Sequence, residues 1–426
     1  MNVFLDMVGC RLNQSEIEAF ARQFRMAGHT LVSEPGKADL VVINTCTVTA
    51  PAASDSRQKV RQAVRSGAHQ VVVTGCHATL NPLEFLDLSG PIQVIGNPQK
   101  ENLVQFLLDL PASSFEHVSI MHQPVPGHRM RTRAFIKVQD GCDNYCTYCI
   151  TRIARGQSKS RTVEDILVDI QSALQGGCQE VVLTGVHLGS WGNDFEKPRQ
   201  LHHLVREILN NTATPRLHLS SIEPWDLSLE FLDLWQDRRL CRHLHLPLQS
   251  GCAATLQRMG RKVTPSVYEE LVREVRQRIP DVSITTDIIT GFPGETELEF
   301  SESLAFTQAM DFAGGHVFTF SPRPGTPAQK LPGQVNSTIA KHRNKRIHQL
   351  LEQSSSTYRL QHLGQDLVVL WEKASLNHDH SWQLTGLSDN YLRVRAISPS
   401  PCKNQLMSVH ITGSERDGLI GEIFLK

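Results

Sequence analysis

Residues 142–149 have the sequence Cys-Asp-Asn-Tyr-Cys-Thr-Tyr-Cys, so Cys142, Cys146 and Cys149 form a C-x3-C-x2-C pattern. Thiolates are soft ligands that suit iron–sulfur clusters. Three of them on one loop can hold three irons of a four-iron cluster and leave the fourth iron open to an external ligand. A zinc site or unpaired thiols are the alternatives, but zinc usually takes four protein ligands and no fourth cysteine is nearby. The pattern therefore predicts a four-iron cluster with one open iron.

This loop directly follows an expected strand and stands at the head of a series of strand–helix units. Thr162 and Asp165 form a typical cap for the first helix, which is expected to end at Gly176 and Gly177. Six units are fewer than the eight of a complete TIM barrel, so we predict a (β/α)6 partial TIM barrel, with the loop at the carboxyl ends of its strands. The expected strands are 134–139, 181–184, 216–220, 242–246, 283–288 and 316–320.

The N-terminal part of the chain shows the same alternation in shorter units. It predicts an α/β fold with a doubly wound parallel sheet. Ser15 is the expected cap of the first helix. Pro111, Pro124, Pro126 and Gly127 mark a linker to the barrel. The expected strands are 3–8, 40–44, 71–74 and 93–95, and the expected helices are 15–27, 55–65 and 101–108.

Three further cysteines, Cys10, Cys46 and Cys76, each lie just beyond the carboxyl end of one of these expected strands. A lone cysteine is more often a small buried hydrophobe. However, ligands of open α/β sheets gather at the carboxyl ends of the strands, and Gly9 and Gly75 permit tight turns there. The positions therefore predict a second three-cysteine cluster. The remaining four, which we expect to be structural, are Cys178, Cys241, Cys252 and Cys402.

From residue 364 onward the helical period stops and five short strands are expected. They predict a small β-barrel of the OB type. Trp371, Trp382 and Tyr391 could stack on nucleic-acid bases, although we expect at least two of them to pack in the barrel core. The expected domains are 1–122, 129–360 and 364–426.

Composition narrows the class of protein. The 426 residues include 43 Lys and Arg against 43 Asp and Glu, which is not the balance of a simple polybasic nucleic-acid binder. No apolar run has the length of a membrane span, and the first residues do not resemble a secretory leader, so we expect a cytoplasmic protein without membrane partners. Ten cysteines in such a chain indicate metal ligands or buried thiols and not disulfides.

The neutral total conceals a basic zone around the cysteine loop. Between residues 129 and 161, eight cations are opposed only by Asp140 and Asp143. A charge run is usually a solvated face, but one that brackets a predicted cluster favours phosphate contacts. The residues expected to contact RNA are Arg152, Arg155, Lys159 and Arg161.

Further motifs accompany the cysteine loop. They include Thr184-Gly185-Val186-His187, Pro247-Leu248-Gln249-Ser250-Gly251 and the run from Thr286 to Glu295. Together with the loop, they resemble the radical S-adenosylmethionine (SAM) methylthiotransferases over nearly the whole chain, and the terminal barrel resembles a TRAM domain. Residues 9–14 and 44–49 are most similar to the group that acts on N6-threonylcarbamoyladenosine in tRNA. One departure is Arg152, where the family usually has proline.

The resemblance implies a radical SAM methylthiotransferase that acts on C2 of N6-threonylcarbamoyladenosine at position 37, in the tRNA anticodon loop. It implies two 4Fe-4S clusters: the loop cysteines would hold the one that binds SAM, and Cys10, Cys46 and Cys76 the one that presents the sulfur. A flavodoxin or ferredoxin would supply electrons. The SAM contacts implied are Thr184, Gly185, Ser220, Glu223, Gln249, Ser250, Asp287 and Phe318.

Three alternatives stay open at this point. The same chemistry acts on isopentenyladenosine in tRNA or on an aspartate of a ribosomal protein in sister groups of the family. A non-catalytic RNA-binding iron–sulfur protein is the third alternative, but it would leave the SAM motifs without a purpose.

Overall fold

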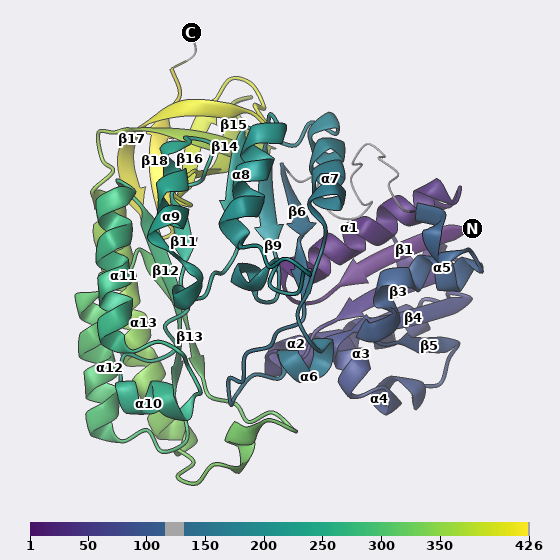
Figure 1. The fold of residues 1–426 in the computed structure, drawn as a ribbon. Helices are drawn as coiled ribbons and strands as arrows, with labels where there is room; N and C mark the ends of the chain where they lie inside the picture. Colours follow the sequence, from purple (N-terminus) through teal and green to yellow (C-terminus); the bar gives the residue numbers. More distant parts are fainter. Residues whose placement is uncertain (116–131, 425–426) are drawn as a thin grey trace.

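The computed structural model describes residues 1–115 and 132–424, and Figure 1 shows three groups of strands along the chain. We name them the N-terminal sheet (β1–β5), the central strands (β6 and β9–β13) and the C-terminal barrel (β14–β18). Most of the expected linker, Arg129, Arg131 and the expected boundaries at 122 and 129 lie outside the described residues. None of the helices in the described part of the chain has the length and apolar character needed to cross a bilayer.

The N-terminal sheet is parallel, with the strand order β2-β1-β3-β4-β5. Apolar side chains alternate between its faces, so one face packs on α1 and α5 and the other on α2 and α4. This arrangement confirms the expected doubly wound sheet. The strands are β1 (Asn2–Met7), β2 (Thr30–Leu31), β3 (Leu40–Thr45), β4 (Gln70–Gly75) and β5 (Ile92–Ile95). The helices are α1 (Arg11–Met26), α2 (Ala50–Arg65), α3 (Cys76–Leu80), α4 (Leu83–Leu86) and α5 (Leu103–Leu108).

The starts of two helices differ from the prediction. Helix α1 begins at Arg11 and not at Ser15, because Cys10 takes the cap position with an extended backbone. Ser15 lies inside the helix, where its hydroxyl accepts a hydrogen bond from the backbone N–H of Lys137 on β6, at 3.0 Å. Helix α2 also begins before residue 55, with Thr49 as its cap. The first turn of α1 is polar because it faces the central strands and the site, and this obscured its helical period.

The six predicted central strands are all present, as two parallel sheets with the orders β10-β9-β6 and β11-β12-β13. One hydrophobic core is shared by both sheets, and a bridge between Leu217 and Leu240 lies where they adjoin. The expected (β/α)6 partial barrel is therefore confirmed. The strands are β6 (Arg133–Lys137), β9 (Glu180–Thr184), β10 (Arg216–Leu219), β11 (His243–His245), β12 (Ser283–Thr290) and β13 (Gly314–Thr319).

Helices cover the outer side of the central strands, as Figure 1 shows for α7, α8, α11 and α12. The cap expected for α7 is present, because the Thr162 hydroxyl accepts a hydrogen bond from the backbone N–H of Asp165. The helices of this part are α6 (Thr151–Arg155), α7 (Val163–Gln175), α8 (Leu201–Asn211), α9 (Leu229–Leu232), α10 (Ala253–Arg258), α11 (Pro265–Arg278), α12 (Glu297–Ala309) and α13 (Ser337–Leu360).

The last five strands form a closed barrel, as predicted, in the order β14-β15-β16-β18-β17. Trp371 is fully buried in its core and Trp382 packs against the same cluster, so two of the three candidate stacking residues serve the core. Tyr391 instead lies in the turn before β16 and faces the central strands. The strands are β14 (Asp366–Leu376), β15 (Trp382–Ser388), β16 (Arg393–Ser398), β17 (Leu406–Glu415) and β18 (Gly418–Glu422).

Candidate active site

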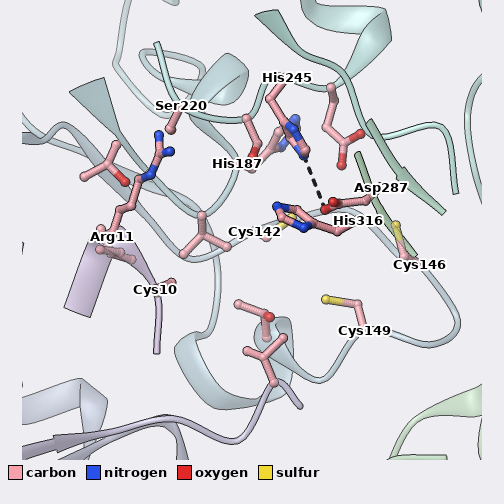
Figure 2. Close-up of a pocket in the computed structure, with 18 of the residues that line it drawn as sticks. Cys10, Arg11, Cys142, Cys146, Cys149, His187, Ser220, His245, Asp287 and His316 are labelled. Atoms are coloured by element: carbon pink, nitrogen blue, oxygen red, sulfur yellow. Dashed lines mark ion pairs between the residues drawn. The ribbon is translucent and has the colours of Figure 1, made fainter. Parts of the chain in front are cut away.

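All six predicted cysteine ligands line a single cavity of about 700 Å³, which Figure 2 shows with four of them labelled. Residues of the N-terminal sheet, the central strands and the C-terminal barrel all contribute to its wall. This volume is within the range of small-molecule and cofactor sites. The cysteines with no ligand-like spacing do not line it.

The loop of Cys142, Cys146 and Cys149 is held by local backbone geometry. A short antiparallel pair, β7 (Gln139–Asp140) and β8 (Lys159–Ser160), brackets the segment. Gly141 has a φ of +68°, and a side chain there would meet the carbonyl of Gln157 at 1.8 Å. The loop is therefore closed tightly at its base.

The sheet set, Cys10, Cys46 and Cys76, is brought together by three neighbouring parallel strands. Cys46 directly follows β3, Cys76 directly follows β4, and Cys10 lies three residues beyond β1. Gly9 and Gly75 both have positive φ, as expected for tight turns, and a Cβ on Gly9 would lie 2.5 Å from the Cβ of Cys46. Because the carboxyl ends of parallel strands meet at one edge, residues 66 positions apart converge there.

The donor set suits clusters better than a single metal ion. Among the described residues, no three His, Cys, Asp or Glu side chains converge closely enough to hold one ion. The thiol ligands of an iron–sulfur cluster bind different irons, so they surround a larger volume. Burial raises the pKa of the Cys46 thiol to about 11, so this thiol keeps its proton unless a metal replaces it. The two sets of cysteines therefore stay the predicted sites of the clusters.

Seven of the eight predicted SAM-contact residues lie in the cavity wall, at or just beyond the ends of the central strands. Ser250 does not: it is 1% exposed, and its hydroxyl accepts a hydrogen bond from the backbone N–H of Cys252 at 3.2 Å. Gln249 has a φ of +70°, and this turn keeps Gln249 in the wall while Ser250 faces inward. The seven in the wall are Thr184, Gly185, Ser220, Glu223, Gln249, Asp287 and Phe318.

The two carboxylates among these residues already have basic side chains as partners. Glu223 binds Arg261 through both oxygens, at 2.6 and 3.0 Å. Asp287 lies 3.3 Å from His245, the contact marked in Figure 2. One oxygen of Asp287 is buried without a hydrogen-bond partner in the described structure, so it has an unused acceptor beside the cavity.

Several wall residues were not predicted as site residues. His187 is hydrogen-bonded to Asp226 at 2.7 Å and to Asn144 in the cysteine loop at 3.3 Å. Burial lowers its pKa, but hydrogen bonds to Asp226 and Cys142 outweigh this and raise it to about 10. The other unpredicted wall residues include Arg11, His243, His245 and His316. For the strand residues among them, the sequence offered one signal: residues i and i+2 of a strand face the same side, so His243 and His245 are expected to point the same way.

The basic residues expected to contact RNA occupy different environments. The Arg152 guanidinium lies over the ring of Tyr145 at 3.8 Å, on the rim of the cavity. Lys159 is 69% exposed and pairs with Glu101 at 2.7 Å. Arg161 binds Asp169 at 2.7 Å and the backbone carbonyl of Lys137.

Arg155 is buried among carboxylates, which its position in the sequence did not reveal. Its side chain is 2% exposed and donates to Glu16 and Asp140 at 2.9 Å and to Asn13 at 2.8 Å. Glu16 also accepts from buried Lys100 at 2.8 Å. Burial would raise the pKa of Glu16, but Arg155 and the two nearby lysines hold it well below its usual range. Arg155 thus joins the cysteine-loop segment to α1, and its guanidinium is already occupied by two carboxylates and an amide oxygen.

Comparison with protein-family models gives two matches. Residues 136–307 match the radical SAM superfamily, and residues 2–96 match an uncharacterized protein family, UPF0004. Threonylcarbamoyladenosine tRNA methylthiotransferase MtaB of Bacillus subtilis is 34% identical over 91% of this chain and 88% of its own. The chain belongs to the radical SAM methylthiotransferase family.

Other members of the family extend this relationship. The Thermotoga maritima protein of the same name is 36% identical over 87% of this chain and 86% of its own. The tRNA-2-methylthio-N(6)-dimethylallyladenosine synthase of Desulfotalea psychrophila is 28% identical over 99% of this chain and 98% of its own. Enzymes of this family use SAM and two 4Fe-4S clusters.

Solved structures support the fold. The radical SAM methyltransferase TsrM from Kitasatospora setae superposes with a TM-score of 0.59, at 17% identity, over 77% of this chain and 75% of its own. The cobalamin-dependent SAM radical enzyme OxsB has a TM-score of 0.52 at 11% identity, over 83% of this chain and 56% of its own.

Proposed function

We propose that this family member transfers a methylthio group to C2 of N6-threonylcarbamoyladenosine at position 37 of tRNA. The observation that carries the proposal is the single cavity lined by both sets of three cysteines. A reaction that needs a radical and a sulfur at the same carbon requires both sources to face one substrate. Relatives named for this base are 33–36% identical, whereas those named for dimethylallyladenosine are 27–29% identical, which favours the former substrate.

Within this proposal, Cys142, Cys146 and Cys149 hold the cluster that binds SAM, and Cys10, Cys46 and Cys76 hold the second cluster. When bound, these groups supply the radical that removes hydrogen from the substrate carbon and the sulfur that replaces it. The protein contributes ligation, orientation and a wall that limits the access of water.

The strand ends would orient SAM beside the loop. Gln249 and Asp287 offer an amide and an unused carboxylate oxygen to polar groups of SAM, and Phe318 offers an apolar surface to its adenine. Glu223 keeps its charge balanced by Arg261, so it can accept a further hydrogen bond without adding net charge to the site.

The tRNA would approach along the rim of the cavity. Arg152 and Lys159 are the predicted phosphate contacts that remain accessible for this, while Arg155 and Arg161 are occupied by carboxylates. We place the reaction in the cytoplasm, with a reduced flavodoxin or ferredoxin as the electron donor.

The test is mass spectrometry of tRNA nucleosides from a strain that lacks this gene, complemented with the wild-type chain or with Cys76→Ala. We expect 2-methylthio-N6-threonylcarbamoyladenosine to be absent from the deletion strain, restored by wild type and not restored by Cys76→Ala. Persistence of that nucleoside in the deletion strain, with no second enzyme able to make it, would show that the substrate is wrong.

A further inference from the structure

Arg11 lies next to a predicted cluster ligand, yet its side chain leaves the N-terminal sheet. It follows Cys10 and is the first residue of α1. Figure 2 shows its guanidinium extending away from Cys10 toward Ser220, at the end of β10. It lines the cavity that holds both cysteine sets. The side chain is therefore placed between the site of the sheet set and the interior of the partial barrel.

The contacts of this guanidinium are neutral. It donates a hydrogen bond to the hydroxyl of Tyr391, and the rings of Phe135 and Tyr391 lie 5.9 and 5.5 Å from it. In the described part of the chain, no carboxylate lies within ion-pair distance of it. The two carboxylates of the cavity wall, Glu223 and Asp287, are paired with Arg261 and His245.

Arg155, also in the cavity wall, shows the usual arrangement. Its guanidinium binds two carboxylates, Glu16 and Asp140, and these neutralise it. A cation that is partly withdrawn from water and has no counter-ion is costly, so such a group indicates an anion that arrives with a ligand. A guanidinium has a planar fork of donors that matches the two oxygens of a carboxylate.

We propose that Arg11 binds the carboxylate of the threonylcarbamoyl group and so selects this base over adenosines whose N6 substituent carries no charge. The inference rests on the proposed function. A carboxylate held by this guanidinium would place the substituent in the same cavity as the sheet set, from which C2 has to receive sulfur. Tyr391 orients the guanidinium by accepting its hydrogen bond, which makes Tyr391 a positioning residue.

The threonyl group is one source of a carboxylate, and the methionine part of SAM is another. The two sources predict different results. If Arg11 binds the substrate, its loss weakens binding of the modified RNA and leaves the KM for SAM in uncoupled SAM cleavage unchanged. If Arg11 binds SAM, that KM rises whether or not RNA is present.

The first experiment compares wild type, Arg11→Gln, Arg11→Lys and Arg152→Gln, all loaded with iron. The ligands are two anticodon stem-loop RNAs of the same sequence, one with N6-threonylcarbamoyladenosine and one with unmodified adenosine. We expect wild type to prefer the modified RNA by at least about tenfold in Kd, the value of one charge-assisted pair. Arg11→Gln should lose this preference, Arg11→Lys should retain part of it, and Arg152→Gln should weaken both RNAs equally.

A change on the substrate tests the same contact without altering the protein. A stem-loop whose threonyl carboxylate is a methyl ester should bind wild type about tenfold more weakly than the free acid, while Arg11→Gln should bind both equally. This comparison stays informative if Arg11→Gln loads less iron, because the wild-type arm needs no variant.

The outcomes separate the two proposals. If wild type methylthiolates the modified RNA and Arg11→Gln keeps the full preference, the role of Arg11 is overturned and the function stands. A rise in the KM for SAM with the RNA preference intact also overturns it, in favour of the SAM carboxylate. If wild type does not act on the modified RNA, the proposed function fails and this inference with it.

Discussion

The two cysteine sets line the same cavity but are assembled in different ways. The loop set lies within residues 142–149, between the two strands of a small hairpin. The sheet set comes from residues 10, 46 and 76, and only the pairing of β1, β3 and β4 brings these positions to one edge. One set depends on a local turn and the other on a correctly ordered sheet.

This difference determines how each set responds to damage. A local loop keeps its ligand spacing as long as its base stays closed. The sheet set needs strand register, turn geometry and the packing of α1 against the central strands, so it is the more vulnerable set. Arg155 links them, because it follows the loop in sequence and binds Glu16 and Asn13 on α1.

Removing one cysteine ligand from each set should have the largest effects on activity, and the two variants should lose different activities. Cys149→Ala should lower reductive SAM cleavage by at least about a thousandfold, since the cluster that binds SAM is lost. Cys46→Ala should abolish methylthio transfer but leave SAM cleavage nearly intact. Each variant should lose about half of the iron. Quantification of iron and of 5′-deoxyadenosine in anaerobic preparations measures both, and equal loss of cleavage in the two variants would contradict separate roles.

Removing the Arg155 ion pairs, which link the two cysteine sets, should lower the free energy of unfolding by several kcal/mol. Arg155→Met leaves the buried Glu16 and the half-buried Asp140 short of a cation, and removing one partner of a buried pair costs about 3–5 kcal/mol in the free energy of unfolding. Lys159→Met, on the same segment, removes an exposed pair worth about 0–1 kcal/mol. Denaturant unfolding of the two iron-loaded variants tests this, and similar losses would show that the Arg155 network is not what joins the sets.

Alanine substitutions at two glycines can distinguish the cost of backbone strain from the cost of a steric clash. Gly75 and Gly156 have similar backbone angles, with φ of +95° and +77°, in a region that costs other residues about 1–3 kcal/mol. A Cβ on Gly75 would meet the carbonyl oxygen of Thr45 at 2.3 Å, whereas one on Gly156 would meet nothing within 4 Å. Gly75→Ala should therefore be about 2 kcal/mol more destabilising than Gly156→Ala. Thermal unfolding of both variants measures the difference in stability. Equal losses of stability would mean that the backbone around Thr45 can move to make room for the new methyl group.

The smallest effect is expected at the rim. Arg152→Gln should weaken tRNA binding by several-fold and reduce the slope of log Kd against log salt concentration by about one, as expected for loss of one phosphate contact. Iron content and uncoupled SAM cleavage should stay unchanged, which distinguishes the rim from both cysteine sets. A salt slope identical to that of wild type would show that Arg152 does not contact phosphate.

The sequence predicted much of this arrangement for physical reasons that are visible in particular residues. Continuous apolar runs reveal β3 and β4, and turn glycines reveal the sheet edge at Gly9 and Gly75, because both signals depend only on neighbours in the chain. The start of α1 was wrong because its first turn faces the site and so lacks the apolar period. Ser250 does not line the cavity, and the positive φ of Gln249 directly before it is a backbone feature that no local sequence pattern indicated.

By itself, the sequence determined the loop set, the family and the order of the three groups of strands, since spacing and periodicity are local properties. Only the tertiary structure decided that Arg155 is buried between carboxylates and that Arg11 is left without one. Both are arginines within a few residues of a predicted ligand, and their sequence neighbourhoods do not distinguish them. The difference arises because α1 packs against the central strands, which brings Glu16 to Arg155 and directs Arg11 into the cavity.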